Sequence, residues 1–299
     1  MNFSQLCEYE IENELWFVEI EHGFTYLEIN NSKAHATIST YSGQVLSYRP
    51  KDQQHDLLFV SDKAYYENGK AIKGGIPVCW PWFGPDPDDL GRPAHGFVRN
   101  RQWSVSASES LADGSTRVVL SLTDNDATRA IWPHPFRLDI EITVGDSLRV
   151  ALLTHNSGDQ SVTISQALHS YFQVGDIGQV RVLGLDGTDY LDKVDGAARK
   201  TQAGPVTIAG EVDRIYTGVT GEQVIDDESL GRKVHITSRG CSTAVVWNPW
   251  ADIAASMGDL DDDDYRKMIC VETANAGPET VEIAAGDEYR LEAEYTIEC

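Results

Sequence analysis

Short segments of alternating or β-branched residues recur along almost the whole sequence, and this pattern is its strongest constraint on the fold. In "LDIEITVGDSLRVALLTHN" (138–156), apolar residues alternate on both sides of Gly145-Asp146, which predicts a β-hairpin. Turn-forming stretches such as "DGS", "NSGDQ" and "AAGD" separate the segments. Long helical periodicity is scarce, and short helices are expected only near 123–132 and 260–268. We therefore expect a single all-β domain over 1–299, a large antiparallel structure of two packed sheets.

The charge of the chain excludes some classes of partner. It carries 47 acidic and 24 basic side chains, a formal net charge of −23. This balance argues against nucleic acid, which requires a basic surface, and against an anionic membrane. Solubility is the simplest meaning of the acidity, and a small local group of cations can still bind an anion. A small molecule is the expected partner.

The N-terminus and the cysteines bear on the cellular compartment. "MNFSQLCEYEIENELWF" lacks the cationic start and apolar run of a signal peptide, and no apolar stretch approaches the length of a transmembrane helix. The five cysteines are scattered and include no CxxC pair, so we expect neither a disulfide framework nor a zinc site. The sequence favours a cytoplasmic protein.

Two ionisable residues stand inside apolar strand segments. In "SQALHSYFQVG", alternation places His169 and Tyr171 on one face, where the histidine lines a cavity or is simply a hydrogen-bonded core residue. In "MICVETAN", Glu272 shares a face with Met268 and Cys270. A carboxylate among buried neighbours costs roughly several kcal/mol if it is unpaired. Glu272 therefore pairs, acts as a base with a shifted pKa, or turns outward at the strand end.

A group of cations precedes these strands. "RPAHGFVRNRQW" gathers His95, Arg99 and Arg101, which either bind a phosphate or carboxylate or are solvated loop charges. Lys73 stands directly before "GGIPVCWPWFG" (74–84) and could reach the same place. Asp213, in "EVDRIYTG", carries no signal by itself, and a salt bridge or a turn is its default role.

The segment 74–84 begins with two adjacent glycines and also contains two prolines and three aromatic residues. The glycines permit a close approach of the backbone to a ligand, and the prolines stiffen the loop. Val78 and Cys79 are expected to pack inward. Trp82 or Phe83 either offers an apolar face to a ligand or is part of the core.

Several well-known sites are missing from the sequence. It contains no GxSxG, HExxH, P-loop or GxGxxG motif. The acidic run "GDLDDDDYRK" has Asp264 where an EF-hand needs glycine and Cys270 where it needs a bidentate glutamate. We therefore predict no metal site.

Seven fragments occur in the order found in a known family. They are "AIKGGIPVCWPWFG", "HGFVRNRQW", "WPHPF", "ALHSYF", "EVDRIY", "VVWNPW" and "MICVETAN". From about Gly43 to the C-terminus the chain resembles the hexose-6-phosphate mutarotases, also called glucose-6-phosphate 1-epimerases. The resemblance implies a galactose-mutarotase-like fold, which is a large antiparallel β-supersandwich, and an isomerase that interconverts α and β anomers without a cofactor.

The resemblance also implies roles for residues of this chain. His169 and Glu272 match the family's catalytic histidine and glutamate, with Glu272 as the base and protonated His169 as the acid of ring opening. Asp213 matches a position that binds sugar hydroxyls, and Arg99 matches an arginine on the phosphate side of the substrate. The expected substrate-binding residues are Asp213 and Arg99 together with Lys73 and His95.

Three positions depart from the family pattern. Lys73 replaces a common arginine and attracts phosphate as a point charge rather than as a bidentate fork. Ala94 stands where some members have glutamine, and Ile253 where a lysine is frequent. The need for the 6-phosphate is therefore open.

Two other functions remain possible: a mutarotase of unphosphorylated aldoses, and a carbohydrate-binding or regulatory protein without catalysis. A monomer is expected because the sequence shows no obvious apolar interface.

Overall fold

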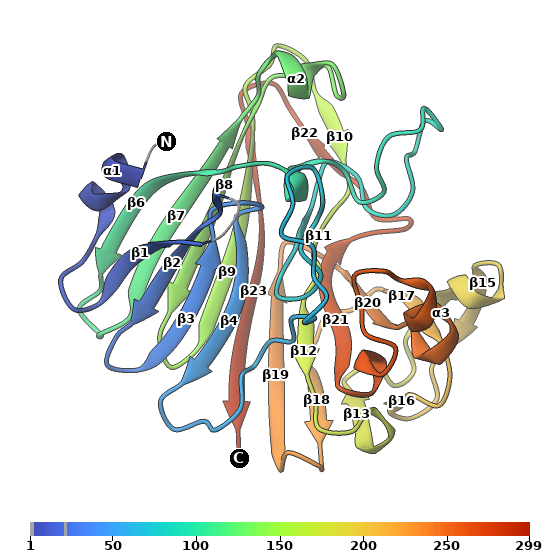
Figure 1. Ribbon diagram of the computed structural model, residues 1–299. Helices are drawn as coiled ribbons and strands as arrows, with labels where there is room; N and C mark the ends of the chain where they lie inside the picture. The colour runs from blue at the N-terminus through green and yellow to red at the C-terminus, as the bar shows by residue number, and fades with distance from the viewer. Residues whose placement is uncertain (1–2, 21–22) are drawn as a thin grey trace.

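Strands dominate the structure, a computed structural model that describes residues 3–20 and 23–299. Every strand pair within its sheets is antiparallel, and Figure 1 shows them as a twisted, layered sandwich. This confirms the expected all-β class. No helix in the described ranges is long and apolar enough to cross a membrane.

The largest sheet has nine strands and forms one layer of the sandwich. Its strands, in spatial order, are β16 (Val206–Thr207), β13 (Val180–Leu183), β18 (Gln223–Asp227), β19 (Arg232–Arg239), β23 (Glu288–Glu298), β9 (Leu148–Asn156), β8 (Phe136–Val144), β7 (Thr116–Thr123) and β6 (Ser104–Ser110).

An eight-stranded sheet faces one part of this layer. Its order is β15 (Ala198–Thr201), β14 (Asp189–Asp192), β17 (Val212–Thr217), β20 (Thr243–Asn248), β21 (Met268–Asn275), β11 (Gln166–Leu168) and β5 (Val78–Cys79), while β12 (Tyr171–Gln173) also pairs with β21.

Two smaller sheets complete the β structure. The first has four strands, β1 (Leu15–Glu19), β2 (Thr25–Asn30), β3 (Ala34–Ser39) and β4 (Gln44–Pro50), and the second pairs β10 (Val162–Ile164) with β22 (Val281–Ile283). The two packed sheets expected from the sequence are therefore accompanied by further β layers.

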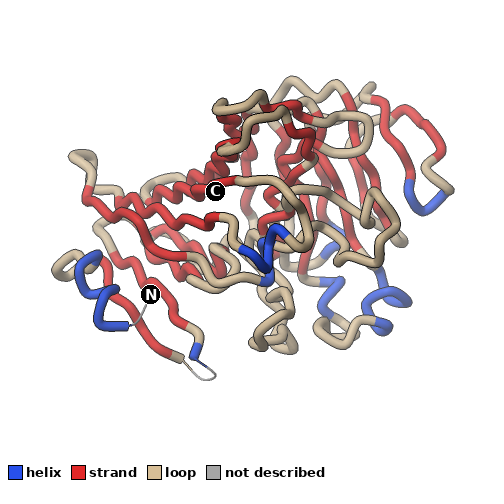
Figure 2. Tube along the Cα trace, turned by 90° about the horizontal axis from the view of Figure 1, so that it is seen from above, coloured by secondary structure: helices blue, strands red, loops and turns tan. Residues whose placement is uncertain are grey.

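Helices are few and short, and Figure 2 shows them at the periphery of the strands. The α-helices are α1 (Phe3–Leu6), α2 (Asp126–Arg129) and α3 (Trp250–Ser256); single 3-10 turns are η1 (Cys7–Tyr9), η3 (Val98–Asn100), η4 (Ile177–Gln179), η5 (Lys193–Asp195) and η6 (Asp264–Arg266). The helix expected near 123–132 is confirmed by α2, whereas 260–268 contains only the 3-10 turn η6. Helix α3 was not expected.

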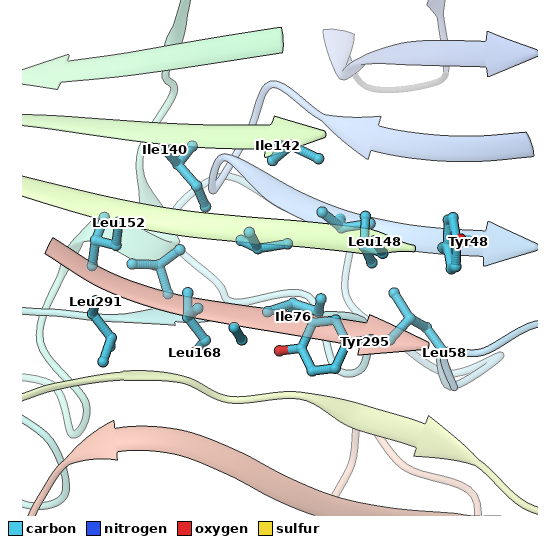
Figure 3. Close-up of a cluster of buried hydrophobic side chains, with 14 of the residues drawn as sticks. Tyr48, Leu58, Ile76, Ile140, Ile142, Leu148, Leu152, Leu168, Leu291 and Tyr295 are labelled. Carbon is cyan, nitrogen blue, oxygen red and sulfur yellow. The ribbon is translucent and has the colours of Figure 1, made fainter. Parts of the chain in front are cut away.

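The predicted hairpin is formed by β8 and β9. Val144 lies opposite Leu148, with 145–147 as the connecting loop. Both strands have the same burial pattern, in which inward apolar residues alternate with more exposed ones near the turn. Ile140 and Ile142 of this hairpin belong to the buried cluster in Figure 3, together with Leu291 of β23. The hairpin therefore supplies much of the core face of the nine-stranded sheet.

The four-stranded sheet and the eight-stranded sheet both pack against this core face of the nine-stranded sheet. The hydroxyl of Tyr48 in β4 donates to the carbonyl of Gly145 at 2.9 Å. On the eight-stranded side, the ring of Phe172 lies 5.5 Å from that of Tyr295, and the Ser170 and Tyr295 hydroxyls are 2.6 Å apart. The outer face of the eight-stranded sheet is thereby left to build a site.

Candidate active site

Strand β21 carries the predicted glutamate in the middle of the eight-stranded sheet. Every residue of this strand is buried. Ile269 and Val271 join the main core, whereas Met268 and Cys270 pack in a separate cluster on the opposite face. Glu272 lies on the same face of the strand as Met268 and Cys270, as the alternation predicts, and is opposite Val245 of β20. Its carboxylate therefore points away from the main core.

The predicted histidine lies at the break between β11 and β12. The backbone N–H of His169 donates to the carbonyl of Pro77 at 3.0 Å, which fixes the main chain there. The imidazole stacks on the ring of Tyr171, with centroids 4.8 Å apart and an interplanar angle of 11°. Since β11 and β12 both pair with β21, the histidine is placed beside the glutamate strand.

These two side chains meet although 103 positions separate them in the sequence (272 − 169). Nε2 of His169 lies 3.5 Å from Oε1 of Glu272, and both side chains are buried. The other polar atom of each, Nδ1 of His169 and Oε2 of Glu272, has no hydrogen-bond partner in the described chain. Buried polar atoms are almost always paired, so two such atoms in one place indicate a site for a polar ligand.

A cavity of about 210 Å³ opens over this pair. The structure brings all six residues predicted from the sequence to its wall: Lys73, His95, Arg99, His169, Asp213 and Glu272. The remaining lining comes from Phe83, Tyr171, Lys193, Val245, Trp247 and Met257. Aromatic and apolar walls with a few converging polar groups are typical of a small-molecule site.

Three cations surround the cavity, and their partners differ. Nζ of Lys193 lies 3.0 Å from Oδ2 of Asp213. Nζ of Lys73 lies 3.5 Å from Oδ2 of Asp259. Arg99 instead donates from Nη2 to the carbonyl of Ala94 at 3.0 Å, and its Nε is buried without a partner in the described chain. Arg99 is therefore the cation most available to an anion.

Burial shifts the pKa values of the central pair in opposite directions. Burial, with the nearby Asp213 charge, holds the pKa of Glu272 well above its usual range against the influence of Lys193 and Arg99. Burial, with the charges of His95, Arg99 and Lys73, holds the pKa of His169 well below its usual range. Burial therefore favours the uncharged form of each of the two groups.

A second histidine is also uncharged. Burial and the nearby cations Arg99, Lys193 and Lys73 lower the pKa of His95 to about 3. Gly84 N–H lies 3.4 Å from Nδ1 of His95, which leaves Nε2 as the protonated nitrogen of the neutral ring. His95 therefore offers a neutral hydrogen-bond donor that suits a hydroxyl, and not the positive charge for an anion that the sequence suggested.

The segment 74–84 divides its residues between core and cavity. Gly74 has a φ of +116°, and a Cβ there would meet the Phe59 carbonyl oxygen at 2.4 Å, so only glycine fits. Val78 and Cys79 are buried in β5, which confirms the inward packing expected for them. Trp82 is buried as well, whereas Phe83 lines the cavity, edge-on to His95.

Sequence reasoning missed four contributors to the wall, Lys193, Val245, Trp247 and Met257. Lys193 lies on η5 after β14, and no local pattern distinguishes it from a solvated lysine. Trp247 lies opposite Cys270 and next to the site because β20 pairs with β21. Trp247 and Val245 lie on the same face of β20, but this would have indicated a place in the cavity wall only if the pairing of β20 with β21 had been known. Of the departing positions, Ala94 contacts Arg99 through its backbone, and Ile253 is part of α3.

Another cavity, of about 420 Å³, is less suited to chemistry. A half-buried carboxylate in its wall, that of Asp56, accepts backbone N–H bonds from Tyr48 at 3.0 Å and Leu58 at 2.8 Å and a hydroxyl bond from Ser47. Asp264 in the same cavity accepts from Ser61 at 2.9 Å. These carboxylates are satisfied by the protein itself, in contrast to Glu272.

The raised pKa of Glu272 predicts how stability depends on pH. A folded-state pKa above the ordinary 4.5 means that the folded protein binds this proton more tightly, so the free energy of unfolding falls as pH rises from 4.5 to the folded-state pKa. Each unit of difference corresponds to about 1.4 kcal/mol. Glu272→Gln removes this loss, so the difference in melting temperature between the variant and the wild type should shift in favour of the variant as the pH rises from 4 to 8.

Thermal denaturation of both proteins at several pH values measures this effect. Glu282→Gln is the matched control, because Glu282 is an exposed position of β22. Melting temperatures of wild type and Glu272→Gln that differ by the same amount at pH 4 and pH 8 would contradict an elevated pKa.

Comparison with known proteins places the chain among sugar epimerases. The family described as Aldose 1-epimerase matches residues 25–296. A protein of Escherichia coli K12, provisionally named a glucose-6-phosphate 1-epimerase, is 37% identical over 249 residues, which are 83% of this chain and 82% of the relative. A protein of the plant Cenchrus ciliaris with the same provisional name is 35% identical over 264 residues, 85% of this chain and 79% of the relative.

Solved structures agree with this placement. The crystal structure of a protein from Salmonella typhimurium, provisionally described as a mutarotase, superposes with a TM-score of 0.90 at 30% identity. The match covers 97% of this chain and 95% of the other. The layered antiparallel sandwich is therefore the fold of a mutarotase-like relative over nearly its full length.

Proposed function

The chain belongs to the aldose 1-epimerase family and is an isomerase of sugars; from this premise we propose that it interconverts the α and β anomers of a hexose 6-phosphate, with glucose 6-phosphate as the first candidate. The observation that carries the proposal is the contact between His169 and Glu272 inside the lined cavity, with one unpartnered buried polar atom on each side chain.

The reaction requires one group that accepts a proton and one that donates a proton on the same sugar. Glu272, as carboxylate, takes the proton of the anomeric hydroxyl, and the electron pair of that O–H bond forms the C1 carbonyl. Protonated His169 donates to the ring oxygen as the C1–O5 bond breaks and its electron pair stays on O5. Rotation about C1–C2 and the reverse transfers close the ring on the other face. Each group plausibly contributes roughly 10²–10⁴-fold.

Burial of the pair assists this cycle. Opening the ring converts carboxylate and imidazolium into a neutral carboxyl and a neutral imidazole, which is the arrangement that a low-dielectric environment favours. The pair keeps one proton throughout, and that proton belongs to the pair rather than to either residue. The cavity therefore stabilises the open-chain stage relative to the charged starting pair.

The remaining wall residues suit a sugar with an anionic end. Arg99 and Lys73 supply positive charge, and we assign the phosphate to them. Asp213 and neutral His95 offer an acceptor and a donor for hydroxyl groups. The names of the relatives, glucose-6-phosphate 1-epimerase, support the same substrate.

A mutarotase of unphosphorylated aldoses is the second candidate. It is favoured by one observation: two of the three cations of the cavity, Lys73 and Lys193, already have carboxylate partners. A carboxylate near the anion-binding end weakens phosphate binding more than hydroxyl binding.

Anomerisation of freshly dissolved glucose 6-phosphate and glucose, followed by polarimetry or by exchange NMR, tests the proposal. We expect the protein to accelerate both above the buffer rate, with the phosphate preferred. Buffer rates for both sugars would reject an epimerase acting on these substrates and favour a binding protein. Equal acceleration of the two sugars would reject only the assignment of the phosphate.

Lys73→Ala tests the anion end of the cavity. Because the ammonium is expected to attract the 6-phosphate and not the neutral sugar, the substitution should raise KM for glucose 6-phosphate about three- to tenfold more than KM for glucose. Lys70→Ala is the matched control, since Lys70 pairs with Glu67 outside the cavity. An unchanged ratio of the two KM values would remove Lys73 from the anion site.

A further inference from the structure

A carboxylate stands behind the anion-binding end of the cavity. Oδ2 of Asp259 lies 3.5 Å from Nζ of Lys73, and the two side chains are only 22% and 17% exposed. Lys73 lines the cavity, whereas Asp259 is not among the lining residues. Lys73 therefore lies between the ligand space and a negative charge.

The loop that carries Asp259 is fixed at both ends. At one end, the backbone N–H of Met257 donates to Ala254 at the end of α3, and the side chain of Met257 lines the cavity with its Sδ 3.9 Å from Nζ of Lys73. At the other end, the carboxylate of Asp264 accepts from the Asp261 N–H at 2.9 Å. The position of the Asp259 carboxylate is thus set by the fold.

Ser61 joins this loop to the segment of Lys73. Its backbone N–H donates to the carbonyl of Lys73 at 3.1 Å, and its hydroxyl donates to Asp264 at 2.9 Å. Ser61 therefore ties the backbone of Lys73 to Asp264, at the end of the loop that carries Asp259.

This arrangement affects an anionic ligand selectively. A phosphate that approaches Lys73 must share the ammonium with Asp259 and is also repelled by that carboxylate. A neutral sugar meets neither effect. Arg99 has no such competitor in the described chain. Its guanidinium donates to the Ala94 carbonyl, and its buried Nε has no hydrogen-bond partner there. Among the described residues, the anion end therefore combines Arg99, which has no carboxylate partner, with Lys73, which is partly neutralised.

We propose that Asp259 is a specificity-determining residue: by engaging Lys73 it lowers the preference for phosphorylated over unphosphorylated hexose, so that the site accepts both. The proposal rests on the proposed function, because it concerns the selectivity of the same cavity. It assigns the substrate range to a side chain outside the cavity wall.

Asp259→Asn tests this role with little change in shape. The ratio of KM for glucose to KM for glucose 6-phosphate should rise about three- to tenfold, with the change in KM rather than in kcat. Inorganic phosphate provides a second measurement: it should inhibit glucose anomerisation by Asp259→Asn at about three- to tenfold lower concentration than it does for the wild type.

Asp261→Asn is the matched control, because Asp261 lies in the same loop but its carboxylate pairs with Lys63 at 3.4 Å, outside the cavity. Asp261→Asn should leave both the KM ratio and the inhibition by inorganic phosphate at the wild-type value. An active wild type whose KM ratio and phosphate inhibition are unchanged by Asp259→Asn would overturn the role of Asp259 alone. A wild type inactive on both sugars would overturn the proposed function and, with it, this inference.

Discussion

Glu272→Gln should reduce the catalysed anomerisation of glucose 6-phosphate by about 10²–10⁴-fold at saturating substrate. The amide has nearly the shape of the carboxyl, so the strand, the wall and the contact with His169 are retained. It cannot take the proton of the anomeric hydroxyl, and this proton transfer is what we assign to Glu272. The loss should fall mainly on kcat, because the hydroxyl groups of the sugar are expected to bind other residues.

The measurement is exchange NMR between the two anomeric signals, with the buffer rate subtracted. Glu282→Gln makes the same chemical change on the exposed face of β22 and should retain full activity. If Glu272→Gln kept more than about a tenth of the wild-type kcat while folded, Glu272 would not be the base.

His169→Gln should cause a loss of similar size, about 10²–10⁴-fold, because it removes the group that protonates the ring oxygen. The hydrogen bond from the His169 backbone to Pro77 does not depend on the side chain, whereas the stack on Tyr171 is lost with the imidazole ring. The melting temperature of the variant therefore has to be measured beside its activity.

The double variant gives the sharper result. Two groups that pass one proton between them act as a unit, so Glu272→Gln combined with His169→Gln should be about as slow as either single variant. Multiplicative losses would contradict the shared proton. His235→Gln is the control, since His235 also lies between two carboxylates, Glu222 and Glu298, but on the nine-stranded sheet.

The local pattern of the strands could be predicted from the sequence because it depends on neighbouring residues. The hairpin around Gly145-Asp146 and the sides taken by Glu272 and Tyr171 follow from the two-residue period of a strand. The same period places Met268 and Cys270 beside the glutamate. These predictions required no knowledge of which strands pair.

The assembled site could not be predicted from local pattern, because it depends on pairing between distant strands. Trp247 reaches the wall only because β20 lies between β17 and β21. Lys193 and Asp259 lie in connections whose course is set by tertiary packing. The resemblance of sequence fragments supplied the catalytic candidates, but it gave no indication that Lys73 has an acidic neighbour.

The segment 74–84 shows both what local sequence can predict and what depends on tertiary packing. Its two adjacent glycines predict a close approach of the backbone to a ligand, whereas in the structure Gly74 passes against the backbone of Phe59 and Val60 and Gly75 against that of Val45. The sequence left Trp82 and Phe83 open between core and cavity. The structure separates them, because Trp82 donates to the Pro93 carbonyl and is buried, while Phe83 faces His95.

The location of the pair on a fully buried strand, with the charged wall residues on connections, has an evolutionary consequence. Glu272 lies on β21 and His169 is held between two strands that pair with it, whereas Lys73, Arg99 and Asp259 lie outside the regular strands of the eight-stranded sheet. Loops tolerate substitution and insertion far better than central strands. A lineage can therefore change which sugar it prefers by substitutions in these loops and still inherit the proposed catalytic pair of His169 and Glu272 intact.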